Sequence, residues 1–146
     1  VMHLHTTDGI AVSALQEGLL PLSQQSLFAL ASLSYHDYEG VALREDEKAR
    51  LQKDLGNTNF MILRNHGLLT TGSSIPDAFL AMYILQTSCQ IQIRALSGDR
   101  PLTPIPAGIV DTIRQQADQV TKGLGGKLAW PGLLRKLDRI DASFRE

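Results

Sequence analysis

Three of the four histidines in the chain have the spacing of a metal-binding set. His3 and His5 lie two positions apart in the opening sequence Val-Met-His-Leu-His. Side chains of an extended strand alternate between its two faces, so both rings are expected to point the same way. His66 stands in the sequence Arg-Asn-His-Gly, where Gly67 favours a sharp turn that leaves the ring projecting. Three imidazoles suit Zn²⁺ or another divalent ion and leave a coordination position for water or substrate, as in catalytic metal sites.

This pattern has an ordinary alternative. Two histidines on one strand can simply form hydrogen bonds, and distance along the sequence does not by itself bring His66 to them. The residues alone therefore indicate a candidate metal site, and its completion depends on the fold.

The fourth histidine, His36, stands in the sequence Tyr-His-Asp-Tyr-Glu-Gly. It could be a fourth metal ligand, contact the substrate, or be held by hydrogen bonds near the site, and the residues alone favour the last. Asp37 and Glu39 could orient a ligand histidine by accepting a hydrogen bond from its second ring nitrogen. The alternative is a polar turn with two tyrosines packed at its base.

The elements that must position these side chains follow from local patterns. Residues 1–5 are expected to form a strand, and Thr7 or Asp8 can cap a helix that continues to about Gln16. Ser23 can cap a second, apolar helix. Residues 34–43 are expected to be irregular and extended, and residues 44–56 to form a helix with a charged outer face that ends at Gly56.

The stretch 59–72 predicts an apolar strand, an Asn-His-Gly turn and a returning strand. Ser73 or Ser74 then caps the longest helix, with Pro76 in its first turn and Asp77 placed favourably for the helix dipole. Apolar residues recur at helical spacing along it: Ile75, Phe79, Met82, Leu85, Cys89 and Ile93. Strands interleaved with helices predict an α/β fold with helices covering a sheet.

The remainder, 98–146, is expected to form a linker and C-terminal helices. A proline-rich stretch at 97–108 leads to two further helical stretches separated by a flexible Gly-Leu-Gly-Gly-Lys sequence at 123–127. The second stretch carries an apolar stripe of Trp130, Leu133, Leu134 and Leu137. This stripe can pack on its own domain or on a neighbouring subunit.

Composition narrows the class of protein. The 146 residues carry a net charge of −1 and are 43% hydrophobic, which fits one globular domain and gives no electrostatic footprint for nucleic acid or a membrane surface. No apolar run is long enough to span a bilayer. The lone Cys89 excludes an internal disulfide and fits a reducing cytoplasm. Within a helical apolar stretch, it is expected to be a buried hydrophobe rather than a nucleophile.

Several segments together resemble the class II aldolase/adducin family, and in particular its adducin-like bacterial branch. They are HLHT at 3–6, AVSALQEGLLPLSQ at 11–24, YHDYEGVAL at 35–43 and LRNHGLLTTG at 63–72. The resemblance covers residues 1–97, the expected core, and resumes weakly at 130–141. It implies a three-layer α/β/α sandwich that lacks its N-terminal portion here.

The resemblance also implies site residues. The family's metal histidines match His3, His5 and His66, and its metal is Zn²⁺ or another divalent ion. The family's acid/base glutamate lies upstream of Val1, and its catalytic tyrosine has no match in this chain.

Two functions follow from the resemblance. The first is a metal-dependent, aldolase-like carbon–carbon lyase, or a related epimerase or decarboxylase. It would act through an enediolate on a hydroxylated carbonyl or sugar-phosphate-like substrate, as a cytoplasmic homo-oligomer, either dimer or tetramer. The alternative is a non-catalytic, adducin-like oligomerisation and actin-binding module with a vestigial metal pocket.

Overall fold

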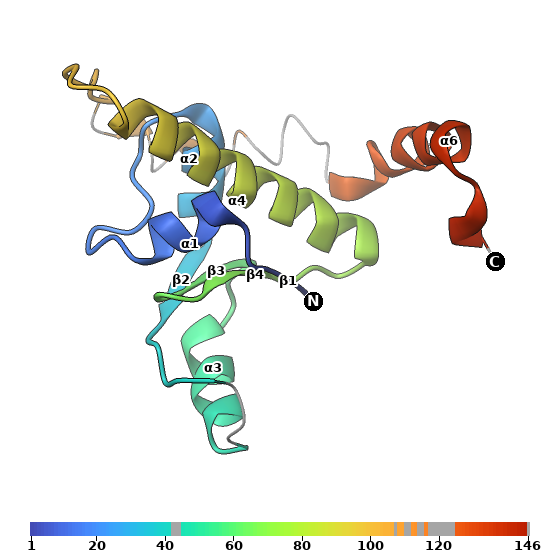
Figure 1. Ribbon diagram of the computed structural model, residues 1–146, viewed down its shortest axis with the longest axis horizontal. Coiled ribbons are helices and arrows are strands. Elements are labelled where there is room, and N and C mark those ends of the chain that lie inside the picture. Colours follow the sequence, from blue (N-terminus) through green and yellow to red (C-terminus); the bar gives the residue numbers. More distant parts are fainter. Residues whose placement is uncertain (42–44, 107, 110–111, 114–115, 117–124, 146) are drawn as a thin grey trace.

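A computed structural model describes residues 1–41, 45–106, 108–109, 112–113, 116 and 125–145 of the chain. Its core is a four-stranded sheet with helices on both faces (Figure 1). The elements of the core are β1 (Met2–Leu4), α1 (Thr7–Ser13), α2 (Gln24–Leu30), β2 (Leu33–His36), α3 (Glu47–Leu55), β3 (Phe60–Leu63), β4 (Gly67–Thr70) and α4 (Ile75–Leu96). After the core come η1 (Gly125–Lys127), α6 (Trp130–Ile140) and η2 (Ser143–Arg145).

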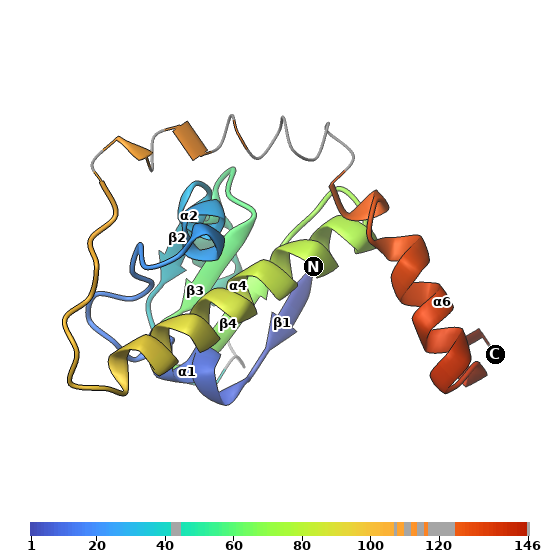
Figure 2. The same cartoon turned by 90° about the horizontal axis from the view of Figure 1, so that it is seen from above.

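The strand order of the sheet is β1-β4-β3-β2. Strands β3 and β4 form the expected hairpin, β1 pairs antiparallel with β4, and β2 pairs parallel with β3. Helix α3 is the crossover between the two parallel strands and covers one face, whereas α1, α2 and α4 lie on the other (Figures 1 and 2). The sequence-based prediction of an α/β sandwich is confirmed.

Local capping explains where the helices of the core begin. Ser23 and Ser74 are the caps of α2 and α4, as expected, and each accepts a hydrogen bond from a backbone N–H of the first turn. The expected start of α1 was wrong by one residue or two, because Thr6 is its cap and accepts from the N–H of Gly9 at 3.2 Å. The helix also stops at Ser13, short of Gln16.

The expectation that residues 34–43 are irregular was wrong at their start. Leu33–His36 form strand β2, which pairs in register from Leu33 opposite Phe60 to His36 opposite Leu63. The strand is too short to show a clear alternation of apolar and polar residues, and its hydrogen-bonding partner lies far along the chain. Tertiary pairing therefore decides its conformation.

The main core lies between the sheet and the helices α1, α2 and α4. Its fully buried residues include Val12, Ile62, Leu68, Leu85 and Cys89. Burial, followed by the negative charge of Asp8, raises the pKa of the Cys89 thiol to about 12. Cys89 is a core residue without nucleophilic character at neutral pH, in agreement with the prediction.

A smaller apolar cluster holds α3 against the opposite face of the sheet. Met61, Leu63 and Leu69 come from the sheet, and Leu51 and Leu55 pack on them from α3. This contact fixes the distance and orientation of α3 relative to the end of the sheet at which the histidines lie.

The segment after the core returns to the beginning of α4. The N–H of Gly126 donates to Asp77 Oδ1 at 3.0 Å, and the rings of Phe79 and Trp130 lie 5.5 Å apart. Helix α6 extends away from the sheet (Figure 2). The first of the two helical stretches expected here lies largely outside the described residues, and the division at residue 97 stays a prediction. Among the helices that the structure describes, none has the length and apolarity needed to cross a membrane.

Candidate metal centre

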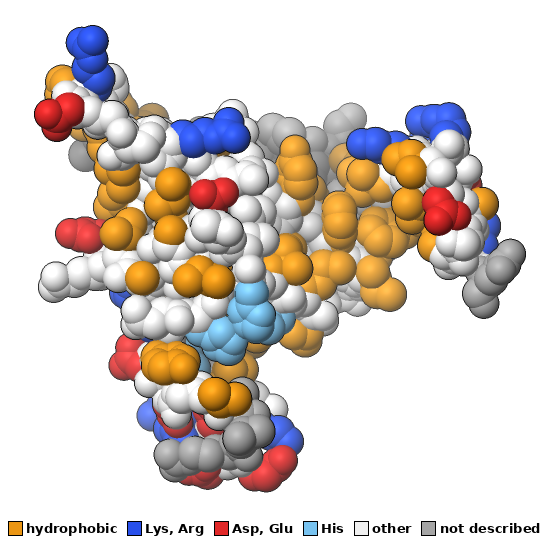
Figure 3. All heavy atoms as spheres, viewed as in Figure 1, with side chains coloured by type: hydrophobic (Ala, Val, Ile, Leu, Met, Phe, Trp, Pro, Cys, Tyr) orange, Lys and Arg blue, Asp and Glu red, His pale blue; other side chains and the backbone are white. Residues whose placement is uncertain are grey.

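His3, His5 and His66 come together at one end of the sheet. One ring nitrogen from each lies within 4.8 Å of the others. The ring centroids are 4.4 Å apart for His3 and His5, 4.9 Å for His3 and His66, and 4.7 Å for His5 and His66. The histidine side chains form a continuous patch beside α3 on the face shown in Figure 3.

Two backbone features bring His66 to the opening strand. Asn65 has a φ of 55°, the left-handed conformation that asparagine tolerates better than most residues, and so reverses the chain before His66. Gly67 then passes so close to β1 that a Cβ on it would lie 2.5 Å from the carbonyl oxygen of Leu4. Only glycine permits this approach, and the approach is what places the turn beside His5.

The hydrogen bonds of His3 define which of its nitrogens can bind an ion. Its Nδ1 lies 2.8 Å from the carbonyl oxygen of Leu68, which can only accept, so Nδ1 carries the proton. Nε2 is left with its lone pair and lies 2.8 Å from Nε2 of His5. A metal-binding histidine commonly donates its other ring N–H to a backbone carbonyl in this way.

The local electrostatics favour a neutral His66. Partial burial lowers its pKa below the ordinary 6.5, and the charges of His3 and His5 lower it further, whereas Glu47 acts in the opposite direction. Since a metal binds the neutral form of imidazole, this environment favours the state of His66 that can act as a ligand.

The donor set fits a divalent ion. Three nitrogens held about 2.0–2.1 Å from a tetrahedral Zn²⁺ would lie roughly 3.4 Å from one another. The ligand nitrogens of the three rings lie within 4.8 Å of one another, which is within about 1.4 Å of that spacing. Three neutral ligands would leave the ion its full charge and an open position, although their role as ligands stays a prediction.

A pocket of about 210 Å³ adjoins the three-histidine cluster. His3 and His66 line one side of it, and Glu47 and Leu51 of α3 line another. A pocket of this size suits a small molecule with a few polar groups.

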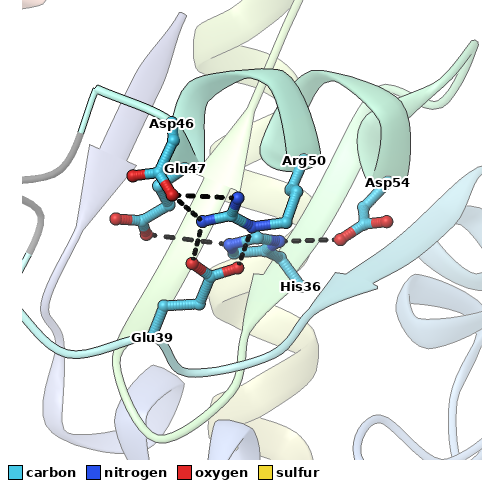
Figure 4. Close-up of polar contacts among 6 residues, drawn as sticks. All are labelled: His36, Glu39, Asp46, Glu47, Arg50 and Asp54. Atoms are coloured by element: carbon cyan, nitrogen blue, oxygen red, sulfur yellow. Dashed lines mark hydrogen bonds and ion pairs between the residues drawn. The ribbon is translucent and has the colours of Figure 1, made fainter.

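His36 also lines this pocket and is only 4% exposed. Its Nδ1 lies 2.7 Å from Oδ2 of Asp54, and its Nε2 faces Oε1 of Glu47 at 3.7 Å (Figure 4). Of the three roles considered for His36, the geometry fits a histidine held by hydrogen bonds near the site.

The two acidic residues next to His36 lie elsewhere on the rim of the pocket. Asp37 is exposed there, and Glu39 forms an ion pair with Arg50 of α3 (Figure 4). Their predicted effect on a metal ligand stays a prediction.

Glu47 and Asp54 were not among the residues expected at the site. The signal that could have revealed them is their spacing: residues seven apart share one face of a helix, and both sit on a helix that follows the His36 segment.

Comparisons with known proteins identify the family of the chain. Residues 1–93 match the family model described as the class II aldolase and adducin N-terminal domain. Over its whole length the chain is 57% identical to a Pseudomonas aeruginosa protein of the aldolase class 2 type, and the match covers 58% of that protein. The crystal structure of an aldolase II superfamily protein from Pseudomonas syringae superposes with a TM-score of 0.90 at 42% identity, over 99% of this chain and 58% of that one.

A more distant likeness is to the L-fuculose 1-phosphate aldolase of Glaciozyma antarctica. Its TM-score is 0.59 at 29% identity, over 84% of this chain and 43% of that one. The chain thus spans little more than half the length of the proteins most similar to it among these. The match to the family model covers most of the chain, and the chain belongs to the class II aldolase and adducin N-terminal domain family.

Proposed function

We propose that the protein is a divalent-metal-dependent lyase of the aldolase type, or a related epimerase or decarboxylase, with Zn²⁺ as the favoured ion. Its substrate would be a small hydroxylated carbonyl compound. The observation that carries the proposal is the convergence of His3, His5 and His66 beside a pocket of about 210 Å³. Two exposed histidines and a half-buried one, from two distant segments of the chain, have no structural reason to gather, whereas an ion would give them one.

The chemistry of the donor set supports the proposal. An ion held by neutral imidazoles keeps its positive charge, and it would stabilise the negative charge that develops on a carbonyl oxygen when a neighbouring carbon–carbon bond breaks. His3 is oriented for this role by Leu68, and the pKa of His66 is lowered toward the neutral form. The names of the similar proteins, which include an L-fuculose 1-phosphate aldolase, point to the same chemical class.

Association of the protein with itself is part of the proposal. Helix α6 contains no buried residue in the described part of the chain, and Leu137 and Ile140 on it are exposed. A dimer or tetramer would cover this apolar surface. We place such an oligomer in the cytoplasm, where a single buried thiol is usual.

The test is metal analysis of the full-length protein purified without chelators, followed by a retro-aldol screen on hydroxylated carbonyl compounds. We expect close to one equivalent of zinc or another divalent ion per chain. The variant His66→Asn should lose it, and Asp46→Asn, a change outside the histidine cluster, should retain it. Wild-type protein without bound metal would contradict the proposal and favour the adducin-like alternative.

A further inference from the structure

A buried histidine lies between two carboxylates behind the candidate metal centre. Asp54 accepts a hydrogen bond from Nδ1 of His36 at 2.7 Å, and Glu47 faces Nε2 at 3.7 Å, beyond hydrogen-bond distance. In the part of the chain that the structure describes, His36 Nε2 is the one buried side-chain nitrogen or oxygen without a hydrogen-bond partner. Buried polar atoms are rarely left in this state, so a partner for Nε2 is expected when the site functions.

The pair formed by His36 Nε2 and the Glu47 carboxylate can hold one proton in addition to the one on His36 Nδ1. An ionised carboxylate only accepts hydrogen bonds, so Asp54 fixes the proton of His36 on Nδ1 and leaves a lone pair on Nε2. Oε1 of Glu47 also offers only lone pairs, and the two atoms can approach to hydrogen-bond distance only when one of them carries a proton. The 3.7 Å separation exceeds hydrogen-bond distance by less than about 1 Å.

Glu47 is the member of this group that reaches the pocket. Its side chain is 14% exposed and lines the same pocket as His3 and His66. It is close enough to His66 for its negative charge to act on the pKa of that ring. Asp46, the preceding residue, is instead 54% exposed and pairs with Arg50.

We propose that Glu47 takes a proton from a hydroxyl group of the substrate in this pocket and that His36, held by Asp54, positions the Glu47 carboxylate. The inference rests on the proposed function. It assigns proton transfer to a residue on α3, in addition to any group that the family resemblance implies upstream of Val1.

The step balances without any further reactant. The substrate O–H bond breaks, and its proton moves to a carboxylate oxygen of Glu47, which then hydrogen bonds to Nε2 of His36. The electron pair left on the substrate oxygen forms the new carbonyl as the carbon–carbon bond breaks. The pair from that bond moves toward the neighbouring carbonyl, and the same proton returns from Glu47 to the carbon.

Glycolohydroxamic acid is a suitable probe, because it binds divalent ions through two oxygens and loses a proton when it does so. Calorimetric titration of the zinc-loaded protein in buffers of different ionisation enthalpy counts the protons released. We expect nearly none from wild type, since Glu47 retains the proton, and about one from Glu47→Gln, as for metal binding by a protonated ligand in general. Asp46→Asn, the matched control, should behave as wild type.

Two further variants separate positioning from folding. His36→Asn keeps an N–H that can donate to Asp54 but removes the nitrogen that faces Glu47. Helix α3 should stay packed on the sheet, and proton release on binding of the probe should rise. Glu47→Asp keeps the negative charge on a shorter side chain, so the carboxylate lies further from the pocket. It should release an intermediate number of protons, and it serves as the test if Glu47→Gln fails to fold.

The two proposals fail in different ways. Binding of the probe to wild type with release of about one proton overturns the role of Glu47 and leaves the metal pocket intact. Failure of the zinc-loaded wild type to bind the probe overturns the proposed function and this inference with it.

Discussion

Gly67 lies against Leu4 so closely that no side chain fits between the two strands. A Cβ at Gly67 would lie 2.5 Å from the carbonyl oxygen of Leu4 and 3.1 Å from Cδ2 of His5. The variant Gly67→Ala must therefore push β1 away from β4 and move His5 from His66. We expect zinc affinity to fall at least about tenfold and the free energy of unfolding by about 1–3 kcal/mol, the usual cost of overpacking.

Competition with a chromophoric chelator and urea unfolding measure the two effects. Gly98→Ala is the control, since a Cβ at Gly98 meets nothing within 4 Å. Unchanged zinc affinity in Gly67→Ala would show that the strand contact does not position the histidines.

The pH dependence of stability should carry the signature of His66. Burial and the neighbouring histidines lower its pKa in the folded protein from 6.5, so the unfolded chain binds the proton more readily. The metal-free protein should therefore lose stability as the pH falls from 6.5 through the lower folded value, and nothing is lost from this source above 6.5. Urea unfolding of wild type and His66→Asn at pH 7.5 and 5.5 tests this. The slope should be shallower in the variant, and equal slopes would contradict the assignment.

Gln92 should be essential for the stability of the turn that follows α1. It is fully buried on α4, its Oε1 accepts from the N–H of Leu20 at 2.7 Å, and its Nε2 donates to the carbonyl of Gly18 at 2.8 Å. Gln92→Leu leaves both backbone groups buried without a partner, and we expect a loss of about 2–4 kcal/mol in the free energy of unfolding. The exposed Gln90→Leu should change it little. Comparable losses in both variants would point to helix propensity or solubility instead.

Asp77 should hold the segment around Gly126 to the start of α4. Its carboxylate accepts hydrogen bonds from Ser74, Ser73 and the N–H of Gly126, and these bonds lower its pKa. Asp77→Ala should release this segment and increase quenching by acrylamide of Trp130, the single tryptophan. Asp99→Ala, in an exposed stretch, is the control. The effect should also develop in wild type at acid pH, because a lowered carboxyl pKa contributes stability above 3.8 that is lost below it.

The features that the sequence predicted well are those fixed by neighbouring residues. Ser23 and Ser74 cap helices through hydrogen bonds within one turn, Gly56 ends α3, and the turn around Asn65 is set by residues on either side of it. Such interactions are visible in a few consecutive letters, and the structure confirms them.

The features that were missed depend on pairing between distant segments. Strand β2 exists because Leu33 lies opposite Phe60, and Glu47 matters because α3 packs on the sheet. Neither contact can be predicted from the residues that neighbour it in the sequence. His3, His5 and His66 come together only because of the register between β1 and β4. Local sequence does not reveal this register, and only the family resemblance suggested that the three histidines are close.

The pairing of β1 with β4 also sets an order of events during synthesis. The hairpin of β3 and β4 joins residues that are neighbours in the chain, whereas Met2 must wait for Thr70 before it has a partner. A ribosome that extends the polypeptide from its first residue therefore exposes two imidazoles long before the third exists. The three-histidine cluster is therefore complete only after the hairpin has emerged and paired with the opening strand.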